Sequence, residues 1–259
     1  MKSKFNISLG IIIIAVLALR ISLSLLPSFE YDEGAYRAWS ARLVEKGPSQ
    51  FYSAQFFTNN PLGGLYTFWV MGLLKNTFLP NLSYYSKNFD MLLKFPANIA
   101  DIISGIIIYL LIKKMLSRTW AIAGFLMYTL NPAIIFNSAV WGQYDGLSTL
   151  FLLITAYVVA TKKAPELSAL AFVTAWTIKP QAIFLAPVLL LFILTTQKPL
   201  RWITSAAVAF LTLSILFLPF FPSNPMAGII YVNTNSATLF DCTTCFAFNF
   251  WGIFWKLVQ

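Results

Sequence analysis

The chain has 259 residues, of which 58% are apolar and only 10% are charged, and its mean hydropathy is +0.72. A composition this apolar lies outside the range of soluble globular domains, and it excludes a soluble enzyme or nucleic-acid-binding protein despite a formal charge of +9. We therefore expect a single polytopic membrane domain over residues 1–259, with the lipid bilayer and not nucleic acid as its partner.

Long apolar runs recur along the chain. Judged against the roughly 17–25 residues that a membrane-spanning helix needs, they predict an all-α bundle of about seven to eight transmembrane helices. The first run carries Arg20 late and lacks a small-x-small cleavage site, so we expect a retained anchor and not a signal peptide. The runs lie near residues 9–26, 97–112, 119–137, 147–161, 165–178, 181–196 and 203–221, and an eighth begins near residue 248.

Short basic loops set the expected orientation. Lysine and arginine are enriched in loops on the cytoplasmic side of membrane proteins. We therefore expect a cytoplasmic N-terminus, with every second loop and most acidic residues facing outward. The basic segments are Lys2 and Lys4, KKMLSR at 113–118, Lys162 with Lys163, and QKPLR at 197–201.

The first outward loop, residues 27–96, is the longest stretch between predicted spans. Its segment SFEYDEGAYRAWSARLVEKG places Tyr36, Trp39 and Leu43 on one helical face, which predicts a helix lying on the membrane surface. The run at 61–78 is almost long enough to span. Counting it as a span would place KKMLSR outside, so we expect a second, interfacial or re-entrant helix here.

Asp32 is the candidate catalytic base. It begins the predicted surface helix shortly after the first span ends. A carboxylate at this position could simply be a solvated charge that the helix dipole favours. The functional alternative is a general base that accepts a proton from a sugar hydroxyl at the membrane face.

A polar group interrupts two apolar runs at residues 141–146, which read WGQYDG. Trp141, Gln143 and Asp145 follow the Asn131–Pro132 step, where proline disfavours helical geometry in the residue before it. Broken helices at membrane depth are tolerated where they line a polar cavity. The group could be an ordinary loop with an interfacial tryptophan and a capping aspartate. It could also bind a sugar, with the indole stacked on the ring and the polar groups on its hydroxyls.

Lys179 is the most informative cation. It lies in WTIKPQAIFLAPV between two apolar runs, on the expected outer side, and Gln181 follows closely. A lysine there could extend to the lipid headgroups as a structural residue. Ionisable groups at membrane depth are nevertheless candidates for function. A phosphate ester at the outer leaflet would be its natural partner, with Arg37 and Arg42 as secondary candidates.

Cys242 and Cys245 form a CTTC sequence in the last predicted outward loop. Outside the membrane such a pair could form a disulfide or take part in redox chemistry. Two small thiols in an apolar loop are more often packing residues. Both interpretations stay open at this stage.

Five blocks occur in an order that carries a resemblance. They are DEGAYRAWSARLVEKG from residue 32, FY at 51–52 followed by NNPLGGLYTFW, NPAIIFNSAVWGQYDG from residue 131, TIKPQAIFLAPV from residue 177, and FAFNFW at 246–251. Together they resemble the prokaryotic relatives of the GPI-anchor mannosyltransferases, which are GT-C superfamily membrane enzymes of the glycosyltransferase 87 type.

The resemblance implies a GT-C-like bundle and an inverting transfer of a hexose, expected to be mannose, from a polyprenyl-phosphate donor. The acceptor would be a lipid-linked or surface glycan at the non-cytoplasmic face. Because a lipid monophosphate has no nucleotide diphosphate that needs a metal clamp, neither a metal nor another cofactor is expected. The implied roles are base for Asp32; sugar binding for Trp141, Gln143, Asp145, Tyr36, Trp39, Asn59 and Asn249; and donor-phosphate binding for Lys179, Gln181 and Arg37.

Two positions depart from the resemblance. Asn59 stands where an aspartate is usual, and Leu62 replaces a proline. The relatives are also generally longer, so we expect a chain that is truncated within its eighth span or unusually short. An inactive or partial GT-C-like subunit is therefore the second interpretation. A transporter or flippase is the third, with Asp101, Asp145 and Lys179 lining a pathway, although the internal repeat common in transporters is not visible.

Overall fold

The computed structural model describes residues 2–53, 56, 58, 60–161 and 164–238, and every regular element in these ranges is helical. The expected all-α fold is therefore confirmed for this part of the chain. The longer helices are α1 (Lys2–Leu23), α2 (Glu30–Lys46), α3 (Leu62–Phe78), α4 (Lys87–Met115), α5 (Arg118–Thr129), α7 (Asp145–Thr161), α8 (Pro165–Ile178), α9 (Ala186–Thr196), α10 (Pro199–Phe217) and α11 (Pro225–Thr238). Shorter elements are η1 (Pro48–Gln50), α6 (Pro132–Ile135), the π-helical turn η2 (Phe136–Trp141) and η3 (Pro180–Leu185).

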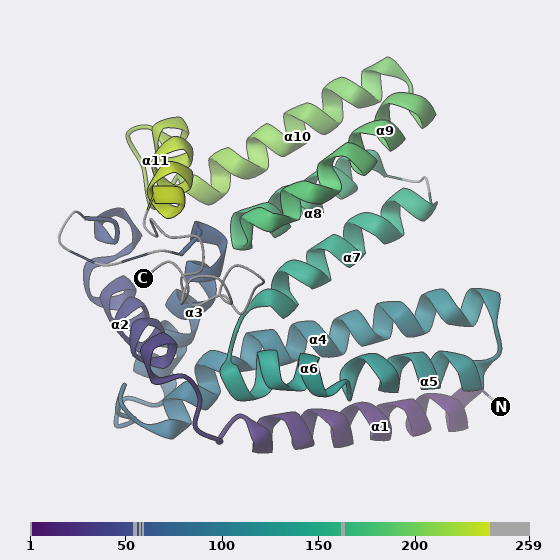
Figure 1. The fold of residues 1–259 in the computed structure, drawn as a ribbon, viewed down its shortest axis with the longest axis horizontal. Coiled ribbons are helices and arrows are strands. Elements are labelled where there is room, and N and C mark those ends of the chain that lie inside the picture. Colours follow the sequence, from purple (N-terminus) through teal and green to yellow (C-terminus); the bar gives the residue numbers. More distant parts are fainter. Residues whose placement is uncertain (1, 54–55, 57, 59, 162–163, 239–259) are drawn as a thin grey trace, which may run out of the picture.

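The long helices run lengthwise in two groups (Figure 1). One group contains α1, α4 and α5 with α6, and the other contains α7 to α10. Helix α4 joins the groups, because it packs against both α5 and α7. Helices α2, α3 and α11 gather at the end of the molecule opposite to the N-terminus.

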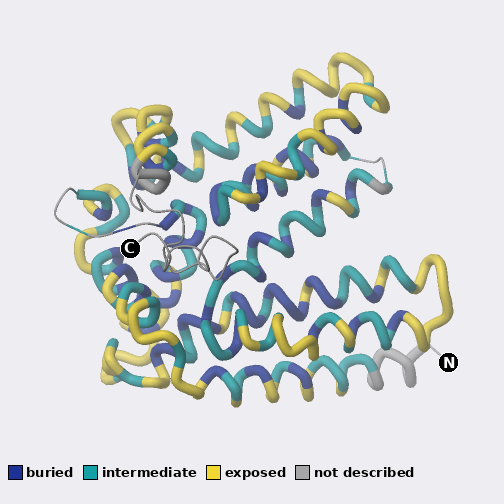
Figure 2. Tube along the Cα trace, viewed as in Figure 1, coloured by how far each residue is buried: buried dark blue, intermediate teal, exposed yellow. Residues whose placement is uncertain are grey.

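Several helices have the length and the apolar surface of membrane spans. Among the described residues, α4 and α10 are long and apolar enough to cross a membrane, and α5 with the segment Pro132–Trp141 forms a third candidate that bends by 46°. Large apolar side chains lie exposed on the outer sides of α9 and α10 (Figure 2), including Leu191, Ile203 and Ile215. Exposed apolar area of this extent fits contact with lipid. The apolar helices therefore mark a membrane protein.

The break predicted at Asn131–Pro132 is present. Asn131 has extended backbone angles (φ −60°, ψ 124°), and its side chain accepts a hydrogen bond from the backbone N–H of Ala133 at 2.9 Å. Helix α5 therefore ends before the proline, and a new helical segment begins at it.

Two helices differ from the sequence-based expectation. Helix α4 begins at Lys87, ten residues before the apolar run predicted from residue 97, and it continues through Pro96. Its first turns carry Asp90 and Lys94, which lower the local hydropathy, but both side chains are buried in ion pairs with α2. Helix α11 was not predicted at all. It begins after Asn224, whose side chain accepts from the N–H of Ala227 at 3.0 Å.

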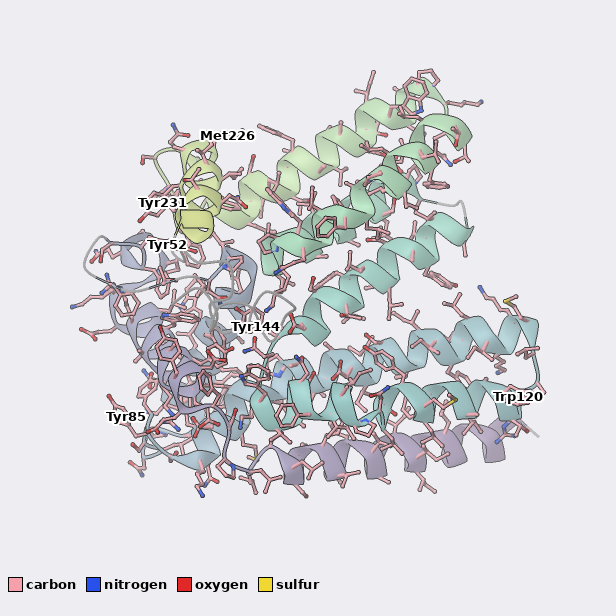
Figure 3. All side chains as sticks on the ribbon, in the orientation of Figure 1. Tyr52, Tyr85, Trp120, Tyr144, Met226 and Tyr231 are labelled. Atoms are coloured by element: carbon pink, nitrogen blue, oxygen red, sulfur yellow. The ribbon has the colours of Figure 1, made fainter. Side chains whose placement is uncertain are left out.

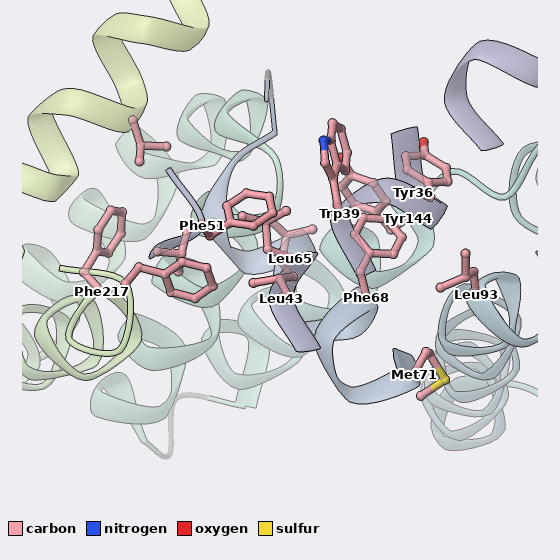
Figure 4. Close-up of a cluster of buried hydrophobic side chains, with 14 of the residues drawn as sticks. Tyr36, Trp39, Leu43, Phe51, Leu65, Phe68, Met71, Leu93, Tyr144 and Phe217 are labelled. Atoms are coloured by element: carbon pink, nitrogen blue, oxygen red, sulfur yellow. The ribbon is translucent and has the colours of Figure 1, made fainter. Parts of the chain in front are cut away.

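A helix is present where the surface helix was predicted, as α2. Gly47 ends it with φ +77°, a conformation that glycine adopts easily, and its N–H bonds to the carbonyl of Leu43 at 3.1 Å. The predicted apolar face is buried, with Tyr36 and Trp39 packed against Phe68 of α3 (Figure 4). Asp32 lies one helical turn before Tyr36 on the same side of α2, so this packing also positions Asp32.

A buried ion pair ties together the group formed by α1, α4 and α5. Arg20 and Asp101 are each fully buried, and the guanidinium contacts the carboxylate directly. Arg20 also donates to Asn98 Oδ1 at 3.0 Å and to the carbonyl of Thr129 at 2.7 Å. Asp101 accepts a further hydrogen bond from Ser138 in η2. Because Asp101 is buried and neutralised by Arg20, it does not line an open path of the kind a transporter needs.

Candidate active site

A cavity of about 300 Å³ lies where α2 meets the segments that precede α3 and α7 and the segment that follows α8. The buried phenol of Tyr144, labelled in Figure 3, belongs to its wall. Six of the residues predicted as site residues line the cavity: Asp32, Tyr36, Trp39, Gln143, Lys179 and Gln181. The structure thus brings together side chains that are distant in sequence. The other residues that line the cavity are Asn60, Pro61, Tyr144 and Pro180.

Asp32 is held by two side-chain donors. The indole Nε1 of Trp141 donates to Asp32 Oδ2 at 2.7 Å, and the amide Nε2 of Gln143 donates to the same oxygen at 2.8 Å. Both bonds end on Oδ2, so Oδ1 receives neither of them. The indole and the amide were expected to contact a sugar. In this structure both bind the carboxylate, and Gln143 also lines the cavity.

An unusual backbone course brings both donors to Asp32. The π-helical turn η2 ends at Trp141, and Gly142 follows with φ +86°, which a residue with a Cβ rarely adopts. The N–H of Gln143 then bonds to the carbonyl of Asn137 at 2.9 Å. Ser28, between α1 and α2, donates to the carbonyl of Trp141 at 2.8 Å. The turn is thus anchored from two sides.

Lys179 and Asp145 form an ion pair beside the cavity. The ammonium lies 2.9 Å from Asp145 Oδ1 and 4.9 Å from the centre of the Tyr144 ring. Asn137 donates to the other carboxylate oxygen of Asp145 at 3.1 Å. Asp145 lies in the first turn of α7, where a negative charge is favourable. Its side chain stays 45% exposed and is a partner of Lys179 and not part of the cavity wall.

Arg37 does not reach the cavity. Its Nε and Nη2 atoms donate to the two carboxylate oxygens of Asp90 at 2.6 and 2.5 Å, and Nη2 also lies 3.6 Å from Glu33. This bidentate pair ties α2 to α4. The assignment of Arg37 to the donor phosphate is therefore not supported by its position. Of the remaining predicted residues, Asn59 and Asn249 lie outside the described residues, as do Cys242 and Cys245.

Two of the cavity residues that had no predicted role, Asn60 and Tyr144, carry polar side chains. Asn60 is 5% exposed, and its Nδ2 has no hydrogen-bond partner among the described residues. The resemblance implied sugar binding for the preceding residue, Asn59, instead. Tyr144 lies inside the quoted WGQYDG segment. Burial raises the pKa of the Tyr144 phenol well above its ordinary value, and burial also raises the pKa of Tyr36, which Asp32 raises further. Both phenols therefore stay protonated and can donate hydrogen bonds.

Comparison with known families adds an independent observation. A family model described as dolichyl-phosphate-mannose-protein mannosyltransferase matches residues 86–224, more than half of the chain. A search of curated proteins returned no match. The matched region contains Trp141, Gln143 and Lys179, whereas α2 with Asp32 precedes it. The chain belongs to the dolichyl-phosphate-mannose-protein mannosyltransferase family.

Proposed function

We propose that the chain is a GT-C glycosyltransferase of the glycosyltransferase 87 type. It transfers a hexose, expected to be mannose, from a polyprenyl phosphate to a lipid-linked or surface glycan acceptor, with inversion. One observation carries the proposal: the oriented carboxylate of Asp32 and the ammonium of Lys179 line the same cavity. The family match supports the reaction class.

Asp32 would act as the general base. With Oδ2 engaged by Trp141 and Gln143, Oδ1 is the oxygen left to take the proton of an acceptor hydroxyl. The acceptor oxygen then forms a bond to the anomeric carbon as the bond from that carbon to the phosphate oxygen breaks. The electron pair leaves with the polyprenyl phosphate. A positioned base of this kind contributes about 10²–10⁴-fold to the rate.

Lys179 would stabilise the leaving phosphate. Negative charge grows on the phosphate oxygens in the transition state, so a fixed cation beside them lowers the barrier. The ion pair with Asp145 and the face of Tyr144 hold the ammonium in place. A lysine has three N–H donors, so the contact with Asp145 leaves others for the phosphate. Gln181, also in the cavity wall, is a second donor for that group.

The sugar would lie against aromatic rings. Tyr36 and Trp39 form part of the cavity wall and offer apolar faces for the C–H side of a hexose. The amide of Asn60 and the protonated phenol of Tyr144 offer polar partners for hydroxyl groups. This assignment moves the stacking role from Trp141 to residues of α2.

We also propose that the chain crosses the membrane about seven to eight times, with a cytoplasmic N-terminus and an outward cavity. Figure 1 supports a common orientation of the basic loops. The connections α4–α5 and α9–α10 and the C-terminal end of α7 lie toward the same side as the N-terminus, away from α2 and α3. Lys113 and Lys114 end α4 and Arg118 begins α5, on either side of the first connection; Lys198 lies in the α9–α10 connection, and Arg201 in the first turn of α10. Basic loops of this kind favour the cytoplasmic side.

The proposed function predicts transfer from lipid-linked donors. Purified protein in liposomes, given radiolabelled polyprenyl-phosphate mannose and a set of glycolipid acceptors, is expected to form a labelled glycolipid of inverted anomeric configuration. Parallel reactions with polyprenyl-phosphate glucose test the choice of hexose. Activity is expected to persist in EDTA, since the mechanism requires no metal. Transfer from a nucleotide sugar alone would contradict the proposal.

Replacing Lys179 by methionine is expected to reduce kcat by about 10²–10³-fold, the usual effect of removing one group that stabilises transition-state charge. The methionine keeps most of the apolar stem and removes the ammonium. The measurement is the initial rate of sugar transfer at saturating donor. Lys198→Met, in the α9–α10 connection at the far end of the molecule, is the matched control and should retain full activity. Equal rates for the two variants would remove Lys179 from the phosphate site.

A further inference from the structure

Lys94 is a buried cation outside the candidate cavity. It lies on α4, its side chain is only 4% exposed, and its Nζ is 2.9 Å from Glu33 Oε1. The same ammonium lies 3.4 Å from the carbonyl oxygens of Ser24 and Leu26, which follow α1. Glu33 is the residue next to Asp32 on α2. One side chain thus joins the end of α1, α4 and the first turn of α2.

The stem of Lys94 lies against the turn that carries the two donors to Asp32. A Cβ added to Gly142 would lie 2.8 Å from Cγ of Lys94 and 3.2 Å from its Cε. Gly142 stands between Trp141 and Gln143, and both of these donate to Asp32 Oδ2. Lys94 therefore forms an ion pair with Glu33, the residue next to Asp32. Its stem also packs against Gly142, in the turn between the two donors to Asp32.

These two contacts assign a role to an otherwise structural lysine. We propose that Lys94 is a positioning residue that sets the register between Asp32 on α2 and its donors on the turn before α7. The inference rests on the proposed function, because positioning has a kinetic meaning only if Asp32 is the base. Displacements of about 1 Å at a site can lower a rate by as much as about 10²-fold. Loss of Lys94 should therefore affect the chemical step more than binding.

Lys94→Met separates charge from packing. The methionine retains an apolar stem against Gly142 and loses the ion pair with Glu33. Its kcat, normalised to folded protein, is expected to fall about tenfold to a hundredfold, with KM for the polyprenyl-phosphate donor changed by less than about threefold. Normalisation uses the fraction that elutes as a monodisperse species from size-exclusion chromatography.

Asp90→Leu is the matched control. Asp90 forms the other ion pair between α2 and α4, through Arg37, but it touches neither Asp32 nor the Gly142 turn. If ties between α2 and α4 acted only on stability, both variants would lose stability and keep their kcat per folded molecule. We expect Asp90→Leu to keep kcat within about threefold of the wild type and Lys94→Met to lose it. Equal kcat values for Lys94→Met and the wild type would overturn the inference.

A double-variant cycle tests the contact with Gly142. Gly142→Ala is expected to lower kcat in the wild-type chain, because its Cβ meets the Lys94 stem and its φ is positive. In a Lys94→Ala background the stem is gone, so the same change should lower kcat by a smaller factor. Equal factors in the two backgrounds would show that the contact is not coupled to catalysis. A wild-type protein without transfer activity would instead refute the proposed function itself, which keeps the two failures distinct.

Discussion

Replacing Asp32 by asparagine is expected to reduce sugar transfer by about 10²–10⁴-fold, the contribution typical of a positioned general base. The asparagine Oδ1 can still accept hydrogen bonds from Trp141 and Gln143, so the local packing should survive. What it cannot do is take a proton from the acceptor hydroxyl. The measurement is the single-turnover rate with polyprenyl-phosphate mannose in liposomes, which isolates chemistry from product release.

Glu30→Gln is the control for this experiment. Glu30 lies in the same first turn of α2, carries the same kind of carboxylate and is absent from the cavity wall. It should retain a rate within about threefold of the wild type, since a charge outside the cavity does not contact the reacting groups. If Asp32→Asn kept full activity, or if both variants lost activity equally, Asp32 would not be the base.

Replacing Arg20 by methionine is expected to lower the free energy of unfolding by about 3–5 kcal/mol, the usual effect of leaving one partner of a buried ion pair unpaired. Arg20 is fully buried, and its loss would also leave the side chain of Asn98 and the carbonyl of Thr129 without a donor. Asp101 would then remain as a buried carboxylate without its Arg20 partner, among α1, α4 and α5. Denaturant titration of the detergent-solubilised protein measures the change.

The double variant Arg20→Met with Asp101→Leu is the informative comparison. An apolar pair of similar volume removes the buried charge together with its partner, so the double variant should be more stable than either single variant. Arg201→Met removes a control ion pair, with Glu166, in which Arg201 is 46% exposed, and should change stability by less than about 1 kcal/mol. A double variant as unstable as the sum of the singles would show that Arg20 and Asp101 act independently.

Much of the candidate site could be predicted because its residues stand out locally. Asp32, Gln143 and Lys179 are polar groups beside apolar runs, and the structure brings all three to one cavity. Which hydrogen-bond or ion-pair partner each polar group would have could not be predicted. Arg37 was a secondary candidate for the phosphate, and only the fold shows Asp90, which is 53 residues away in sequence, bound to its guanidinium.

The helices show the same contrast between what local sequence predicts and what depends on partners elsewhere in the chain. Apolar runs predicted helices at most of the observed positions, and proline predicted the break after α5. The start of α4 was missed because charged side chains mask a helix when their partners lie on another element. The partner of Trp141 could not be predicted either, since an indole suits a sugar face and a carboxylate equally well. In the structure its Nε1 lies 2.7 Å from Asp32 Oδ2.

The long sequence separation inside the base arrangement has a consequence for biosynthesis. Trp141 and Gln143 lie 109 and 111 residues after Asp32. A ribosome therefore delivers the carboxylate well before either donor exists, and a nascent chain that ends before the π-helical turn holds no oriented base. The base arrangement thus forms only after α1 to α6 have been synthesised, and Lys179 follows α8 later still.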